Sequence, residues 1–591
     1  MLKEAAPCIS NSLCKLINFS LSKQEFPFEW KKANVTPIHK GGDTNICNNY
    51  RPISLLSCVG KVMERAVFKH VFNFFRDNLV ISDKQSGYTP NDGAINQFIF
   101  LYHQFCKALD EQKEVRVVFC DISKAFDRVY HPALLHKLAY AGITGQLLAW
   151  FHSYLRNRTQ RVVINGGASS WGNIEAGVPQ GSVLGPLLFL IYINDIVDII
   201  HTNVRLFADD TVLYVTVDNP DIAAEEMNDD LLSVSEWSSE WLLTFNPDKT
   251  KEMIISRKRQ TRYHPNLMYE GKLIGNVQEH KHLGLLLKSD LTWSSHIKNV
   301  CTRAMKMVCI LRSLQYKLNR RSLEILYFSF IRPILEYGNV VFGNCSSEDE
   351  ENLENVQLAA ARAVTGARRY TSHEQIYSET GWDTLATRRK NHKLVIMYKI
   401  VNKIAPQYLQ NLLPQTVNDR SKYNVRSNSK LTVIPARTVS FGKSFFPSTV
   451  RLWNELPVAT RKSESVEEFK SKLQSNKTKV NNLFYIGNRK ENIILAQLRM
   501  GSSSLNADLF KIRVVASPTC TCGSGNEDVF HYFLECPLYA AQRNALQNVV
   551  IPHTCFTVRS LLHGPEKCQN IIKTEIYEAV IKFIQDTNRF T

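Results

Sequence analysis

Three aspartates in this 591-residue sequence stand at the ends of short β-type segments. Asp121 follows the β-rich run 114–120, and the pair Asp209 and Asp210 separates the two β-rich halves of 204–217. This pattern predicts a buried strand that ends in a carboxylate and a hairpin with two acids at its tip. Three carboxylates on neighbouring strands suit two Mg²⁺ ions about 3.5–4 Å apart, an arrangement that catalyses phosphoryl transfer.

An Asp-Asp pair at a hairpin tip also has a simpler explanation, because aspartate is common in turns. A second segment argues for the catalytic alternative. The run Gly177–Pro186 contains three glycines and two prolines and precedes the apolar run Leu187–Ile193. Such a loop has a defined course and lets the backbone come close to a ligand.

These segments resemble the reverse transcriptases of non-LTR retrotransposons, most closely the jockey-like and CR1-like elements. The family pattern continues, in the family's order, through segments 30–42, 49–56, 243–250, 282–284 and 291–293. The last two look like the primer-grip region that closes the palm. The resemblance covers nearly the whole chain and implies an α+β right-hand polymerase fold of fingers, palm and thumb, followed by a mostly helical C-terminal region.

The resemblance also implies roles for single residues. Asp121, Asp209 and Asp210 would be the ligands of two catalytic Mg²⁺ ions, with the carbonyl of Ile122 near the incoming nucleotide. The residues that would border the templating base pair are Gln180 and Gly181. Asp127 lies beyond the strand end, where an acid commonly caps a helix, so we interpret it as structural.

Three basic residues match family positions for binding and proton transfer. Lys40 and Arg51 fall where the fingers grip the triphosphate, although solvated surface residues are the alternative. Lys249 resembles the lysine that protonates the leaving pyrophosphate, and Lys251 is close enough to compete for that role.

Phe126 bears on the choice of sugar. By the resemblance, a ring five residues after the first aspartate would lie beneath the deoxyribose and exclude a 2′-hydroxyl, which predicts a DNA product. An ordinary core phenylalanine is the alternative.

The sequence departs from the family in two ways. Gln85–Gly93 replaces the more usual basic stretch, so template grip is expected to be weaker there. Relatives usually carry an endonuclease ahead of the polymerase, whereas Met1 falls almost at the polymerase boundary. A separate endonuclease is therefore expected to supply the nick that primes copying.

A Cys/His cluster lies near the C-terminus. Three thiols and one imidazole fall within residues 520–536, contributed by Cys520, Cys522, His531 and Cys536. This ligand set predicts a tetrahedral structural Zn²⁺ site, although the Cys-x-Cys spacing is tighter than usual and unliganded thiols are the alternative.

Composition agrees with a nucleic-acid partner. Lys and Arg number 72 against 55 Asp and Glu, a formal net charge of +17 that favours polyanions. No apolar run is long enough to span a membrane and no signal peptide is evident, so we expect an intracellular protein, active in the nucleus, without a membrane partner.

The periodicity suggests four ranges: a helical lead-in at 1–27, fingers and palm at 28–290, a helical thumb and connection at 291–404, and a C-terminal region at 405–591. Polar stretches at 418–430 and 476–482 are typical of connectors.

The predicted function is an RNA-directed DNA polymerase that extends a DNA primer into cDNA with dNTPs on an RNA template. An RNA-templated RNA polymerase shares the metal chemistry, but Phe126 and the family segments argue against it. A decayed or domesticated element product that binds RNA without catalysis is the other alternative, against which the intact acids weigh.

Overall fold

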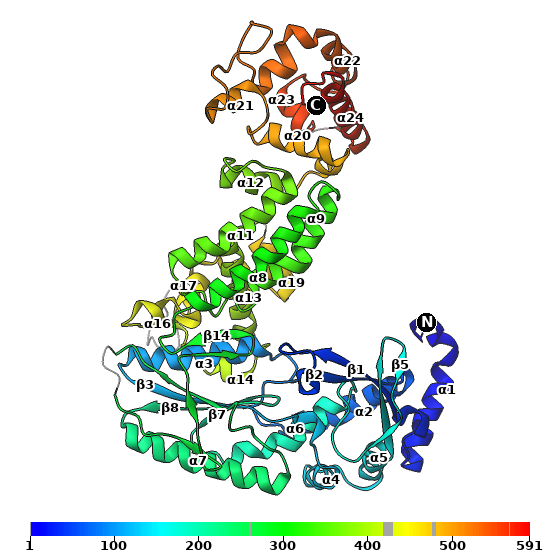
Figure 1. The fold of residues 1–591 in the computed structure, drawn as a ribbon, viewed down its shortest axis with the longest axis vertical. Coiled ribbons are helices and arrows are strands. Elements are labelled where there is room, and N and C mark those ends of the chain that lie inside the picture. The colour runs from blue at the N-terminus through cyan, green and yellow to red at the C-terminus, as the bar shows by residue number, and fades with distance from the viewer. Residues whose placement is uncertain (1, 259–261, 418–429, 475–479, 566–567, 591) are drawn as a thin grey trace. The chain divides into compact units, whose positions relative to one another are not determined.

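The computed structural model describes residues 2–258, 262–417, 430–474, 480–565 and 568–590 (Figure 1). Both predicted connectors lie largely or partly outside these ranges. The chain forms two compact units. The first consists of Met1–Leu291, Ile400–Leu413 and Pro435–Gly442, and the second of the remaining segments. The four ranges predicted from the sequence divide the chain differently and stay predictions.

A five-stranded sheet organises the first unit. Its strand order is β12 (Gly275–Asn276), β9 (Lys251–Ile255), β3 (Glu114–Cys120), β8 (Asp210–Val217) and β7 (Asn203–Phe207). β3 is antiparallel to both neighbours, and all of its residues are buried. Helix α3 (Ala94–Asp110) lies on one side of the sheet and α7 (Pro220–Trp241) on the other (Figure 1). The sheet therefore has a core on both faces, and the predicted buried strand and hairpin are confirmed.

One hydrophobic core joins this sheet to the helices beside it. Helix α6 (Gly185–Ile193) is apolar all round and almost entirely buried. It shares the core with α7 and with three further helices, namely α2 (Cys58–Asp77), α4 (His131–Tyr140) and α5 (Gly145–Leu155). The segment before α6, which is the predicted glycine-rich loop, is therefore anchored in the interior of the unit.

A second sheet contains β1 (Lys32–His39), β2 (Tyr50–Leu55), β4 (Arg158–Ile164), β5 (Gly167–Ala168) and β6 (Gly172–Ile174). β1 and β2 form an antiparallel hairpin, and β4 runs parallel to β1. Two small hairpins complete the unit, β10 (Met268–Tyr269) with β11 (Lys272–Leu273), and β13 (Glu279–His282) with β14 (Leu285–Lys288). The lead-in helix α1 (Leu2–Lys23) packs on α5.

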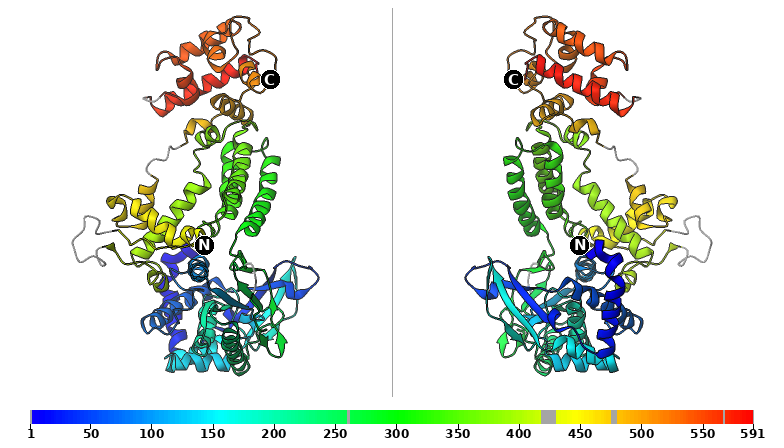
Figure 2. Two further views of the ribbon diagram at one scale, coloured as in Figure 1. Left: turned by 90° about the vertical axis from the view of Figure 1, so that its left-hand side faces the viewer. Right: turned by 90° about the vertical axis from the view of Figure 1, so that its right-hand side faces the viewer.

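The second unit is helical in the residues described. The predicted helical periodicity after residue 291 corresponds to α8 (Ser294–Ser313), α9 (Arg320–Leu326), a π-turn (Tyr327–Ile331), α10 (Arg332–Glu336), α11 (Ser347–Thr365), α12 (His373–Thr380) and α13 (Leu385–Val401). Figure 2 shows α8 and α11 side by side. The later helices are α17 (Phe445–Glu455), α18 (Val458–Arg461), α19 (Val466–Leu473), α20 (Arg489–Arg499), α21 (Asn506–Lys511), α22 (Ala540–Val550), α23 (Val558–His563) and α24 (Asn570–Asp586).

Two short segments from late in the chain belong to the first unit. They contain α14 (Gln407–Gln410) and most of α16 (Val439–Lys443). The carboxylate of Asp110, at the end of α3, accepts backbone N–H bonds from Arg437 at 3.0 Å and Thr438 at 2.6 Å. The first unit therefore draws on chain far beyond residue 291.

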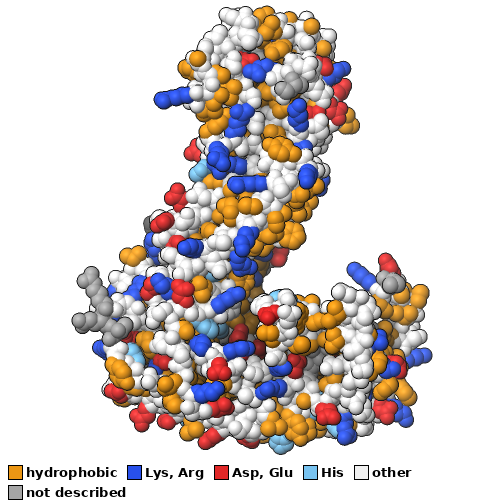
Figure 3. Space-filling model, viewed as in Figure 1, with side chains coloured by type: hydrophobic (Ala, Val, Ile, Leu, Met, Phe, Trp, Pro, Cys, Tyr) orange, Lys and Arg blue, Asp and Glu red, His pale blue; other side chains and the backbone are white. Residues whose placement is uncertain are grey.

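The surface is mixed in charge. On the face drawn in Figure 3, Lys and Arg side chains are spread widely among acidic and apolar ones rather than gathered in one patch. Among the described residues, no helix combines the length and the apolar character needed to cross a membrane.

Candidate active site

The central sheet brings the three predicted aspartates together. In the antiparallel register of β3 and β8, Cys120 pairs with Thr211, so Asp121 comes opposite the turn that holds Asp209 and Asp210. Ala208 turns the chain with a left-handed φ of 55°. Two strand ends and one tight turn thus place three carboxylates at the same edge of the sheet.

These carboxylates repel one another. Burial and then the charge of Asp121 raise the pKa of Asp209, while Arg51 and Lys40 lower it. Burial and the two neighbouring aspartates raise the pKa of Asp210 to about 6, although its side chain still reaches solvent at the hairpin tip. Clustered hard oxygens with unneutralised charge are a donor set that fits divalent cations such as Mg²⁺.

The raised pKa of Asp210 predicts pH-dependent metal binding. Below pH 6 a proton occupies this carboxyl and competes with the cation, so affinity should fall as the pH falls. Between pH 6.5 and 5 we expect the dissociation constant for Mn²⁺ to rise roughly eightfold, measured by electron paramagnetic resonance on the full chain. A constant that stays flat over this range would contradict the shift.

Lys249 lies closer to the acids than its competitor does. Its ammonium is 3.5 Å from Asp121 Oδ2 and two-thirds exposed. Lys251 lies on β9 and donates instead to the backbone carbonyl of Asp248 at 2.7 Å. The general-acid role stays a prediction, and the geometry favours Lys249 for it.

The chain after Asp121 is held by a neighbouring segment. Asn246 N–H donates to the Asp121 carbonyl at 2.7 Å, and Ile122 forms an antiparallel bridge with Phe245. Ile122 is buried. The backbone that carries the first aspartate is therefore supported on both sides, by β8 and by this segment.

Phe126 is half-buried at the border of the core. Its ring stacks on Phe189 of α6 at 4.6 Å between centroids, and Tyr88 meets it edge-on at 6.2 Å. Burial and the charge of Asp209 raise the pKa of Tyr88, which puts this phenol within electrostatic reach of the acids. Phe126 is thus held by two aromatic neighbours yet remains partly exposed, a packing that suits a pocket wall better than an interior core residue.

The glycine-rich loop is attached to β2. Ser54 N–H donates to the Gln180 carbonyl at 2.7 Å. Gly181 has φ of 119°, and a Cβ there would lie 2.6 Å from the Ser54 carbonyl oxygen. Only glycine fits both the backbone conformation and the close approach. The predicted loop therefore packs tightly against the hairpin that carries Lys40 and Arg51.

The helix-cap interpretation of Asp127 is wrong. Its carboxylate accepts a hydrogen bond from Gln180 Nε2 at 2.8 Å, and α4 begins at His131 behind Tyr130 as its N-cap. Lys40 is near enough to lower the pKa of Asp127, which burial raises. Asp127 thus orients the side-chain amide of Gln180 in the glycine-rich loop. A local capping pattern in the sequence could not reveal this contact.

Glu64 is a supporting residue that sequence reasoning missed. This buried carboxylate accepts backbone N–H bonds from Val183 at 2.7 Å and Leu184 at 3.0 Å. Burial raises its pKa and the two N–H groups lower it. The sequence did offer one signal for this role, namely an acid among the apolar positions of the amphipathic segment that forms α2.

Gln85 is a second missed residue. Its side-chain oxygen accepts the N–H of Gly87 at 2.7 Å and of Ala208 at 2.9 Å. Ser86 N–H donates to the Leu206 carbonyl, so this segment lies against β7 like an edge strand. A Cβ on Gly87 would be 2.3 Å from Ala208 N. The segment that departs from the family's basic pattern therefore supports the hairpin that carries Asp209 and Asp210.

The Cys/His cluster is assembled in the second unit. One ligand atom from each of Cys520, Cys522, His531 and Cys536 lies within 4.8 Å of the others. Cys520 and Cys536 have their sulfurs 3.7 Å apart, and Cys522 Sγ is 3.2 Å from His531 Nε2. Zn–S bonds of about 2.3 Å in a tetrahedron place two sulfurs about 3.8 Å apart. The donor set and its spacing fit Zn²⁺.

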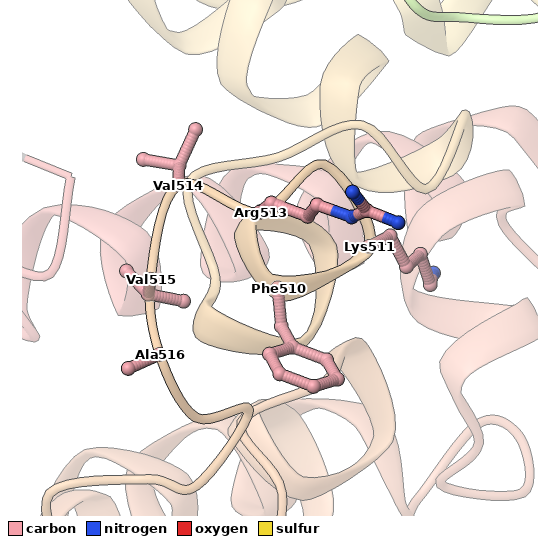
Figure 4. A pocket seen from close by; sticks show the side chains of 6 residues that line it. All are labelled: Phe510, Lys511, Arg513, Val514, Val515 and Ala516. Atoms are coloured by element: carbon pink, nitrogen blue, oxygen red, sulfur yellow. The ribbon is translucent and has the colours of Figure 1, made fainter.

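A pocket of about 680 Å³ is lined by residues of the segment that precedes this cluster in the sequence. Phe510, Lys511, Arg513, Val514, Val515 and Ala516 line it (Figure 4). None of the predicted site residues contributes to this pocket.

Comparison with known proteins agrees with the geometry. Residues 38–287 match the family "Reverse transcriptase (RNA-dependent DNA polymerase)". The RNA-directed DNA polymerase from mobile element jockey of Drosophila melanogaster is 30% identical over 64% of this chain and 42% of that protein. The probable RNA-directed DNA polymerase from transposon X-element of the same organism is 28% identical over 71% of this chain and 47% of that protein.

The chain spans less than half the length of these curated relatives. Among solved structures, apo telomerase from Candida tropicalis aligns with a TM-score of 0.36 at 15% identity, over 66% of each chain. The central sheet and its three acids lie within the matched range 38–287. Residues 38–287 are thus similar to reverse transcriptases, and the chain is similar to the RNA-directed DNA polymerases from mobile element jockey and transposon X-element.

Proposed function

We propose that the chain is an RNA-directed DNA polymerase that extends a DNA primer with dNTPs on an RNA template. The observation that carries this proposal is the convergence of Asp121, Asp209 and Asp210 at one sheet edge, with Lys249 3.5 Å from the first of them. Two of the similar proteins are described as an RNA-directed DNA polymerase and a probable one, which supports the same activity.

The chain's own residues would divide the work between binding and proton transfer. Lys40 and Arg51 pair with the phosphates of the incoming nucleotide, where a guanidinium offers bidentate contacts. Gln180, oriented by Asp127, and Gly181 support the templating base pair. Lys249 donates a proton to the leaving pyrophosphate. Divalent cations at the three aspartates would activate the primer 3′-hydroxyl and offset the charge of the leaving group.

Primer extension by the purified chain tests the proposal. An RNA template annealed to a DNA primer is incubated with Mg²⁺ and either dNTPs or rNTPs. Preferential deoxynucleotide incorporation supports a reverse transcriptase, whereas preferential ribonucleotide incorporation supports an RNA-templated RNA polymerase. A folded chain that binds the hybrid without extending it supports an RNA-binding element product.

Phe126 predicts the strength of sugar discrimination. Phe126→Ala removes the ring proposed to exclude the 2′-hydroxyl, so we expect kcat/KM for rNTPs to rise by about a hundredfold relative to dNTPs, equivalent to about 2.7 kcal/mol. Phe189→Leu, which changes the ring stacked beneath Phe126, is the matched control and should alter discrimination severalfold at most. An unchanged ratio in Phe126→Ala would remove the steric-gate role.

We further propose a structural Zn²⁺ at the Cys/His cluster, because four soft or borderline ligands converge there. A separate endonuclease that supplies the primer end, and activity in the nucleus, stay predictions from the family resemblance.

A further inference from the structure

A buried cation lies within the hairpin of β7 and β8, which carries Asp209 and Asp210 and is called the catalytic hairpin below. Arg205 lies on β7, four residues before Asp209, and is 4% exposed. Its guanidinium donates to the Asp83 carbonyl at 3.0 Å and to Ser86 Oγ at 2.9 Å. Arg205 therefore ties β7 to the 83–92 segment that runs beside it. A charge this deeply buried needs a complete set of partners.

Tyr408 of α14 adds a partner from late in the chain, because its ring covers the guanidinium, whose Nε has no hydrogen-bond partner among the described residues. The Arg205 guanidinium lies 3.8 Å from the centroid of the Tyr408 ring. The Tyr408 hydroxyl donates to Asp92 Oδ1 at 2.8 Å and lies 3.4 Å from Ser86 Oγ. One tyrosine thus covers the cation and contacts the 83–92 segment at two points.

The 83–92 segment in turn touches the turn that holds the acids. Gln85 Oε1 accepts the Ala208 N–H at 2.9 Å, and Gly87 packs directly against the Ala208 backbone. Ala208 immediately precedes Asp209. The path from Tyr408 to the carboxylates therefore consists of a short run of buried contacts within one compact unit.

We propose that Tyr408 is a positioning residue for the catalytic hairpin, although it lies outside the matched range 38–287. The inference rests on the proposed polymerase function. Tyr408 clamps Arg205 and the 83–92 segment together, and that segment sets the position of Ala208 and hence of Asp209. The segment Ile400–Leu413 is by this inference part of the polymerase centre rather than of a connection.

The expected effect is on catalysis more than on binding. Displacing catalytic groups by about 1 Å costs up to about a hundredfold in rate. Tyr408→Ala removes both the ring over Arg205 and the hydroxyl that donates to Asp92, so the 83–92 segment is no longer held against the hairpin. Tyr408→Phe keeps the ring and removes only the hydroxyl, so it should recover most of the loss.

The experiment measures the rate of primer extension by full-length protein. Single-turnover reactions give the concentration of active sites, by which each rate is divided. We expect Tyr408→Ala to lower kcat about ten- to a hundredfold with KM for dNTP changed less than threefold, and to raise the Mg²⁺ concentration for half-maximal rate. Tyr408→Phe should lose severalfold. Tyr140→Ala, at a tyrosine 92% exposed on α4, is the control and should match wild type. A merely structural role would lower the melting temperature and leave the rate per active site unchanged.

Hydrogen exchange supplies a readout independent of activity. Peptides covering 84–92 and 204–212 should exchange faster in both Tyr408 variants and at the wild-type rate in Tyr140→Ala. Unchanged kcat per active site together with unchanged exchange overturns the inference. If Tyr408→Ala does not fold, Tyr408→Phe decides by the same criteria. If wild type does not extend primers, the proposed function fails, and unchanged exchange in Tyr408→Phe would then overturn the positioning role separately.

Discussion

Asp209→Asn is expected to abolish primer extension without destabilising the metal-free protein. The substitution replaces a proposed metal ligand by a neutral amide of the same size, so the rate should fall by at least about a thousandfold. The pKa of Asp209 is raised by burial and by Asp121. The charged form of Asp209 is therefore disfavoured in the folded state, which lowers the stability of the folded protein. This loss of stability appears as the pH rises above the pKa that the carboxyl has in the unfolded chain.

The measurement pairs primer extension with thermal unfolding in EDTA at pH 7.5. We expect the melting temperature of Asp209→Asn to equal or exceed that of wild type. Asp229→Asn, at an exposed acid on α7, is the control and should change neither quantity. An active Asp209→Asn enzyme would exclude the proposed metal site. An inactive variant that also unfolds more readily would show that the acid is structural.

The second large effect is expected at the Cys/His cluster. Cys536→Ser removes a buried thiol from a four-ligand set, and structural zinc sites contribute on the order of 10 kcal/mol to folding. We expect zinc content to fall from about one ion per chain to near zero, and the part of the chain around α22 and α24 to become sensitive to protease. Tyr532 and Phe533 follow the proposed ligand His531 and lie in the core of this region, so loss of the metal should loosen that core.

The measurement is elemental analysis of the full-length protein with limited proteolysis. Cys555→Ser, at an exposed cysteine in the same region, is the control and should keep both the metal and the protection. Retained zinc and unchanged proteolysis in Cys536→Ser would mean that the four side chains cluster without a structural ion.

Local patterns in the sequence determined the elements that carry the chemistry. The run 114–120 predicted β3 with its correct bounds, because its β-branched and aromatic residues favour a strand although Glu114 and Arg116 lie within it. The Asp-Asp pair predicted a hairpin tip, and β7 and β8 meet there. The Cys/His spacing predicted a cluster that the fold assembles. In each case residues near one another in the chain are sufficient to specify the geometry.

The supporting residues were decided by tertiary structure alone. Glu64, Gln85 and Tyr408 each act on backbone or charge that is distant in sequence. Their partners are mostly backbone N–H groups, which have no identity in the sequence, so the sequence does not show which segment each of these residues contacts. Asp127 illustrates the same limit, because its position after a strand suggested a cap whereas its partner is Gln180.

What the sequence by itself determined was therefore the set of reactive groups and the strands and turns that present them. Tertiary structure decided how those groups are held, including the return of Ile400–Leu413 to the first unit. The physical reason is that hydrophobic periodicity and turn chemistry are local properties of the sequence. A buried charge such as Arg205 needs partners, and these come from chain segments that only the fold places beside it.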